Sequence, residues 1–135
     1  MTSSVYLVED HPVIQRALNA LLEAESDLTV SGIAGTAEEA LELIPLGSTD
    51  IVLIDVSLPG MSGLALAARL MGSKPTFRTL MVTGHNDVHY ARAALAAGAN
   101  GYVLKDDPNE IIVAVRAVLA GGIYLSMKIR DQVER

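Results

Sequence analysis

Residues 49–63 read T-D-I-V-L-I-D-V-S-L-P-G-M-S-G, and this stretch decides the fold. Four apolar residues at 51–54 lead directly into an acid, Asp55, and turn-forming residues follow. An uninterrupted apolar run between turn signals is typical of a strand buried on both faces, as in a parallel sheet. In open α/β sheets, chemistry takes place just beyond the carboxyl ends of such strands. Asp55 is therefore a candidate metal ligand, nucleophile or helix cap.

Composition limits the class of protein. The chain has 135 residues, which suffices for one domain with its own core. Its apolar runs are shorter than a transmembrane helix and its N-terminus lacks the basic region of a signal peptide, so we expect a cytoplasmic protein without membrane contact. The absence of cysteine excludes disulfides and thiolate metal sites. The net charge of −6 argues against nucleic-acid binding by this segment alone.

Apolar runs and helical periodicities alternate along the chain. This βα alternation predicts a parallel sheet with helices on both faces. Local signals agree with it, because Thr36 and Glu39 form a capping box and Asp107-Pro108 is a strong helix start. The predicted strands are residues 5–8, 28–34, 51–54, 77–82 and 101–104, and the predicted helices begin near residues 12, 36, 63, 87 and 108.

Five polar side chains stand where these strands end: Glu9, Asp10, Asp55, Thr83 and Lys105. The carboxyl ends of parallel strands share one edge, so we expect these side chains to converge. Three adjacent carboxylates repel one another unless a cation joins them, and hard oxygen ligands favour Mg²⁺. An ammonium and a hydroxyl beside them suit a phosphoryl group. The edge therefore predicts a site that stabilises a phosphoryl group on Asp55, with Mg²⁺ neutralising the charge.

Helix capping is the main structural alternative for the acids. The turn L-P-G at 58–60 argues against a capping role for Asp55, because no helix begins there. The pair Glu9-Asp10 could cap the first helix, and Asp10 could serve both purposes. The three histidines do not form a metal triplet: His85 is expected near the mouth of the site and His89 on a helix surface.

The motifs, in chain order, resemble the receiver domain of bacterial response regulators. They are the acid pair at 9–10, the D-V-S-L-P-G motif at 55–60 with a glycine at 63, the T-G at 83–84 and the G-Y-V-L-K at 101–105. The D-H-P opening and the V-L-A-G-G-I-Y-L-S ending resemble the NarL/LuxR-type subgroup, whose receiver precedes a helix-turn-helix domain. The resemblance implies a flavodoxin-like (CheY-like) fold with five helices and a five-stranded sheet in the order 2-1-3-4-5. It also implies a receiver domain at 1–125 and, at 126–135, a tail or the start of a linker to a missing effector domain.

The resemblance also implies roles for the site residues. A sensor histidine kinase would transfer a phosphoryl group to Asp55. Asp10, Asp55 and the backbone carbonyl of Ser57 would bind Mg²⁺ directly, and Glu9 would act through water. Lys105 would contact the phosphoryl group.

A conformational switch is implied as well. Thr83 would swing toward the phosphoryl group and Tyr102 would change rotamer with it. The surface of the fourth helix, fifth strand and fifth helix would then change. We expect a homodimer on phosphorylation, and DNA contact in transcription regulation only through a C-terminal domain absent from this chain. A stand-alone receiver or a phosphorelay intermediate without DNA output is the alternative.

Other functions are disfavoured. A phosphatase or phosphotransferase with an aspartyl-phosphate intermediate would need a second acid two residues after Asp55, and Ser57 stands there. We therefore expect no enzyme activity beyond self-phosphorylation and self-dephosphorylation. A nucleotide-binding domain would need a glycine-rich phosphate motif, which the sequence lacks. A receiver that is never phosphorylated would not need the complete set of acids, threonine and lysine.

Overall fold

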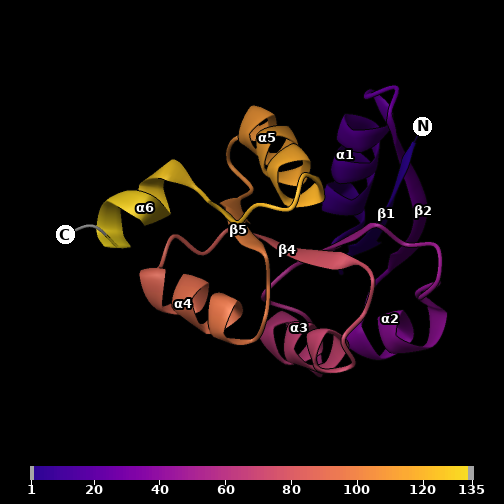
Figure 1. The fold of residues 1–135 in the computed structure, drawn as a ribbon, viewed down its shortest axis with the longest axis horizontal. Coiled ribbons are helices and arrows are strands. Elements are labelled where there is room, and N and C mark those ends of the chain that lie inside the picture. The colour runs from indigo at the N-terminus through magenta and orange to yellow at the C-terminus, as the bar shows by residue number, and fades with distance from the viewer. Residues whose placement is uncertain (1, 134–135) are drawn as a thin grey trace.

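The computed structural model describes residues 2–133 and shows strands and helices in alternation (Figure 1). The strands are β1 (Ser3–Val8), β2 (Leu28–Ala34), β3 (Ile51–Ile54), β4 (Arg78–Thr83), β5 (Gly101–Leu104) and β6 (Tyr124–Leu125). The helices are α1 (Pro12–Glu23), α2 (Ala37–Leu43), α3 (Gly63–Gly72), α4 (Val88–Ala96), α5 (Pro108–Leu119) and α6 (Met127–Val133). Among these described residues, no helix is both long and apolar enough to cross a bilayer.

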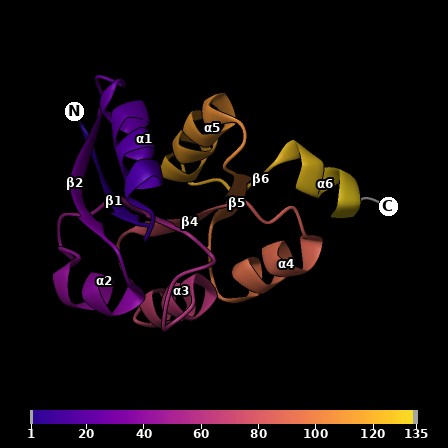
Figure 2. The same ribbon diagram turned by 180° about the vertical axis from the view of Figure 1, so that it is seen from behind.

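The strands form one parallel sheet in the order β2-β1-β3-β4-β5-β6. Helices α1 and α5 cover one face, and α2, α3 and α4 cover the other (Figures 1 and 2). Each face has its own apolar layer, and all four residues of β3 are buried between the two layers. The flavodoxin-like fold and the order of the first five strands are therefore confirmed.

Strand register brings the site residues to one edge. Ile54 at the end of β3 pairs with Val8 on one side and with Met81 on the other. Asp55 N then donates to the Val8 carbonyl at 3.0 Å, and Lys105 N donates to the Thr83 carbonyl at 2.9 Å. The backbone ladder thus continues just past the strands and holds these site residues at a common level.

Two helices begin with the side-chain caps that the sequence predicted. The Thr36 hydroxyl accepts from Glu39 N at 3.0 Å, and the Asp107 carboxylate accepts from Asn109 N at 3.1 Å. The first helix is not capped by the acid pair, which was one alternative role for Asp10. Its N-cap residue is His11, without a side-chain cap hydrogen bond, so Asp10 does not cap α1.

The C-terminal segment adds one strand and one helix to the five of each that were predicted. Residues 124–125 add a sixth strand beside β5, and 127–133 form α6, which packs against α4. Residues 134–135 of the predicted linker lie outside the described part of the chain. A two-residue strand and a seven-residue helix are too short to show a clear periodicity. Charged residues also flank Ile129, the one buried side chain among residues 127–132. The predicted boundary at 125/126, and the attachment of another domain after it, stay predictions.

Candidate functional site

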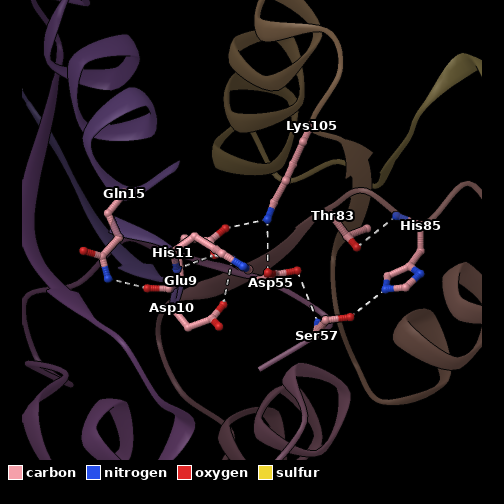
Figure 3. Close-up of polar contacts among 9 residues, drawn as sticks. All are labelled: Glu9, Asp10, His11, Gln15, Asp55, Ser57, Thr83, His85 and Lys105. Atoms are coloured by element: carbon pink, nitrogen blue, oxygen red, sulfur yellow. Dashed lines mark hydrogen bonds and ion pairs between the residues drawn. The ribbon is translucent and has the colours of Figure 1, made fainter. Parts of the chain in front are cut away.

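The carboxyl edge of the sheet brings together Glu9, Asp10, Asp55 and Lys105, as predicted (Figure 3). Lys105 Nζ lies 2.5 Å from Glu9 Oε1 and 3.0 Å from Asp55 Oδ2. Glu9 and Asp55 are only 1% and 5% exposed. One ammonium group therefore bridges two buried carboxylates that come from the ends of neighbouring strands.

The environment of Lys105 stabilises its charged form. Burial disfavours the ammonium, but the hydrogen bonds to Glu9 and Asp55 and the charges of these groups outweigh burial and raise the pKa of Lys105. Lys105 thus remains a cation at neutral pH. The sequence predicted that Lys105 would pair with a phosphoryl group but did not indicate that Lys105 would also pair with Glu9.

The acid pair lies beside a third group, His11. Ligand atoms of Glu9, Asp10, His11 and Asp55 all lie within 4.8 Å of one another. His11 Nδ1 is 3.2 Å from Asp10 Oδ1, close enough for an ion pair, yet this buried oxygen has no hydrogen-bond partner. The distance reflects proximity without the alignment of a hydrogen bond.

These acids fit a divalent cation. Three carboxylates face a single lysine, and a buried oxygen of Asp10 has no hydrogen-bond partner. Such an oxygen is costly unless a cation or water satisfies it. Oxygen donors of this kind suit Mg²⁺, which binds through one or two carboxylates and retains water. The structure thus shows an acidic cluster with the donor set that the predicted cofactor needs.

Asp55 makes a second contact, to the loop that follows it. Its Oδ1 accepts from Ser57 N at 3.2 Å, while Oδ2 faces Lys105. The Ser57 hydroxyl lies 2.6 Å from His85 Nε2 across the mouth of the site. The position expected for His85 is thus observed, but its contact with Ser57 was not predicted. The carbonyl of Ser57 as a metal ligand stays a prediction.

The predicted switch residues Thr83 and Tyr102 both contact the β4–α4 loop. Thr83, the last residue of β4, accepts from His85 N at 3.2 Å. The hydroxyl of the buried Tyr102 donates to the His85 carbonyl at 2.7 Å. Burial raises the pKa of Tyr102 well above its ordinary value, which keeps this hydroxyl a donor. Thr83 and Tyr102 are therefore linked through the backbone of His85.

The structure adds one further neighbour that the sequence did not indicate. Gln15 in α1 donates its side-chain amide to the Glu9 carbonyl at 2.5 Å. This contact ties the first turn of α1 to the backbone of the acid pair. A glutamine in a partly buried helix turn carries no sequence signal for such a role, because only the helix orientation brings it to the loop.

Replacing Lys105 with methionine tests the electrostatics of the site. We expect Lys105→Met to lower the free energy of unfolding by about 3 kcal/mol at pH 7, because two buried carboxylates lose their counter-charge. Since the pKa of Lys105 is raised in the folded protein, this stabilisation is complete below the unfolded value of about 10.4. The difference from wild type should hold between about pH 7 and 9 and shrink as the pH rises through the folded pKa.

Urea unfolding across this pH range measures the effect. Lys128→Met is the matched control, because Lys128 forms an exposed pair with Asp106 and its loss should change stability little. Equal losses in the two variants would contradict the assignment of a buried ion-pair site to Lys105.

An acidic cluster bridged by one lysine, at the carboxyl edge of a doubly wound parallel sheet, is the arrangement that the sequence predicted for a phosphoryl-accepting domain. Residues 5–116 match the family described as the response regulator receiver domain, and the chain belongs to this family. The predicted membership is thus confirmed.

Relatives of the NarL/LuxR type support the predicted subgroup. The chain is 39% identical over 118 residues to the "DNA-binding transcriptional activator DevR/DosR" of Mycobacterium tuberculosis, covering 87% of this chain and 54% of that protein. It is 31% identical over 125 residues to the "Nitrate/nitrite response regulator protein NarL" of Escherichia coli, covering 92% of this chain and 58% of that protein. The chain therefore spans little more than half the length of these curated relatives.

A solved structure shows the same fold. A LuxR-family two-component response regulator from an Aurantimonas species superposes with a TM-score of 0.94 at 33% identity, covering 99% of this chain and 96% of that chain. The chain is a receiver domain of the kind found in NarL/LuxR-type response regulators.

Proposed function

We propose that Asp55 accepts a phosphoryl group from a phosphohistidine of a sensor histidine kinase. The observation that carries the proposal is the bridging of Asp55 Oδ2 and Glu9 Oε1 by Lys105 Nζ at the carboxyl edge of the sheet. Asp55 sits at the centre of this edge, with a cation on one side and the acid pair on the other. When a carboxylate in this setting is phosphorylated, Lys105 can release the carboxylate and bind a phosphoryl oxygen instead.

In the proposed step, an Asp55 oxygen attacks phosphorus as the phosphorus–nitrogen bond of the donor breaks. The donor imidazole leaves with the electron pair and takes up a proton, and Asp55 becomes an acyl phosphate. Lys105 neutralises charge on the phosphoryl oxygens. Thr83 would supply a hydroxyl donor after its contact with His85 N is broken.

Asp10, Asp55 and the Ser57 carbonyl are the proposed Mg²⁺ ligands, with Glu9 acting through water. Mg²⁺ would supply charge neutralisation for the incoming phosphoryl group. The partnerless oxygen of Asp10 supports its direct role.

Labelling with acetyl phosphate and Mg²⁺ tests the proposal. We expect one phosphoryl group per chain, and peptide mapping should place it on Asp55. An acyl phosphate is cleaved by hydroxylamine, whereas a phosphoserine is not, so this reagent separates Asp55 from the neighbouring Ser57. Phosphate on Ser57, or no phosphate at all, would overturn the proposal.

Removing one negative charge from Asp10 tests the metal site. We expect Asp10→Asn to weaken Mg²⁺ binding by at least about tenfold, because it removes half of the directly binding carboxylate pair. Calorimetric Mg²⁺ titration measures the change. Asp131→Asn is the control, because it alters net charge equally from an exposed position on α6. Similar affinities for the Asp10 variant and wild type would show that Asp10 is not a ligand.

We infer the output of this domain from proteins that it resembles. Phosphorylation would promote homodimerisation and control a DNA-binding domain joined after the receiver, in the cytoplasm. The similarity of this chain to DevR/DosR, a DNA-binding transcriptional activator, supports such an output. Beyond its own phosphorylation and dephosphorylation, we propose no enzyme activity.

A further inference from the structure

Helix α6 touches both loops that carry the residues proposed to bind the phosphoryl group. Gln132 donates to Asn86 at 2.8 Å, in the loop that follows Thr83. Lys128 pairs with Asp106 at 2.8 Å, directly after Lys105. Lys128 and Gln132 are four residues apart and share one face of the helix. This face therefore spans the β4–α4 and β5–α5 loops.

The start of α6 is bonded to β5 itself. Ser126 N donates to the Tyr102 carbonyl at 2.9 Å, and the Ser126 hydroxyl accepts from Leu104 N at 2.9 Å. The same hydroxyl donates to Glu110 at 2.7 Å. These buried bonds fix the beginning of α6 to the strand that precedes Lys105.

Glu110 completes this anchor. Its carboxylate also accepts from Tyr124 OH and from Met127 N, each at 3.0 Å. Burial opposes ionisation of Glu110, but the hydrogen bonds from Ser126, Met127 N and Tyr124 outweigh it and lower the pKa. The ionised Glu110 carboxylate thus holds the segment before α6 in place.

The body of α6 is held more weakly than its start. A helix of seven residues is unstable alone in water, so tertiary contacts must maintain it. Ile129 is 0% exposed and joins the apolar layer that contains Tyr102, Leu104 and Ala91. The contacts of Lys128 and Gln132 are exposed. Among residues 127–132, the buried Ile129 side chain, the surface contacts of Lys128 and Gln132, and a 2.8 Å hydrogen bond from Arg130 Nε to the Leu125 carbonyl make a docked state. A modest free-energy change can shift such a state.

We propose that α6 is a built-in restraint on the receiver, docked before phosphorylation and released from α4 and the two loops when Asp55 is phosphorylated. The proposal rests on the function proposed above. Movement of Thr83 and Lys105 toward a phosphoryl group displaces both loops, whereas one turn of helix holds Lys128 and Gln132 at a spacing of about 6 Å. The two surface contacts then cannot both persist. Release pivots at Ser126 and withdraws Ile129 from the apolar layer.

Linkage makes the coupling reciprocal. If phosphorylation weakens docking, weaker docking must favour phosphorylation by the same factor. We expect Ile129→Ala to raise the equilibrium extent of Asp55 labelling at limiting acetyl phosphate, with an increase of about fivefold in the ratio of labelled to unlabelled chain. Lys128→Ala combined with Gln132→Ala should act in the same direction without altering the core. Met127→Ala, on the exposed side of α6, is the matched control.

Hydrogen exchange measures docking directly. Acetyl phosphate with Mg²⁺ should raise exchange of the α6 amides by at least about fivefold in the wild type and leave Asp55→Asn unchanged. Labelled Asp55 with unchanged α6 exchange would overturn the restraint but not the phosphoacceptor assignment. Labelling equal to wild type in both the Ile129 variant and the double surface variant would also overturn it. A wild-type chain without any label would overturn the proposed function, and the restraint with it.

Discussion

Asp55→Asn is expected to abolish labelling by acetyl phosphate in the presence of Mg²⁺. The substitution preserves side-chain size and an acceptor for Ser57 N, but it removes the carboxylate that faces Lys105 at 3.0 Å. An amide is a poor nucleophile and cannot form an acyl phosphate without expelling nitrogen. Glu9 remains to pair with Lys105, so the fold should persist. Intact-mass measurement after incubation with the donor gives the result.

A control at the other end of the same strand separates a missing nucleophile from a general charge effect. Asp50 precedes β3 and accepts from Ser4 N at 2.7 Å, far from the carboxyl edge. Asp50→Asn retains an acceptor there and should label like wild type. Undiminished labelling of the Asp55 variant would exclude Asp55 as the acceptor and direct attention to the acid pair.

Gly63→Ala is expected to cause the largest loss of stability. A Cβ at position 63 would lie 1.8 Å from the Asp55 carbonyl oxygen and 2.9 Å from Val56 Cα. Both are backbone atoms, and Gly63 N also donates to the Val56 carbonyl at 2.9 Å, so the start of α3 cannot withdraw without breaking this bond. We expect the free energy of unfolding to fall by more than about 3 kcal/mol, beyond ordinary overpacking.

Gly72→Ala is the matched control in the same helix. A Cβ there meets nothing within 4 Å, so the substitution should be neutral or stabilise by up to about 1 kcal/mol. Urea unfolding compares the two variants. Equal stability of the two would show that the loop between β3 and α3 can move away from Asp55, contrary to the close approach seen in the structure.

The sequence predicted much of the fold because its signals were local. The apolar run at 51–54 is buried on both faces, as expected, and the capping oxygens of Thr36 and Asp107 bind the predicted helix starts. These features depend on residues a few positions apart. The sequence did not predict β6 and α6, because the contacts that hold them are tertiary: the buried Ile129 and the bonds of Ser126 with β5.

The site likewise has a part that the sequence predicted and a part that it did not. The sequence predicted that Asp10, Asp55 and Lys105 would lie close together, because the carboxyl ends of parallel strands share one edge. The contacts of Lys105 with Glu9 and of Ser57 with His85 depend on the tertiary structure. Partners of this kind are 28 and 96 residues apart. Their pairing depends on strand register and loop conformation, which place side chains within hydrogen-bond distance but leave no periodic trace in the chain.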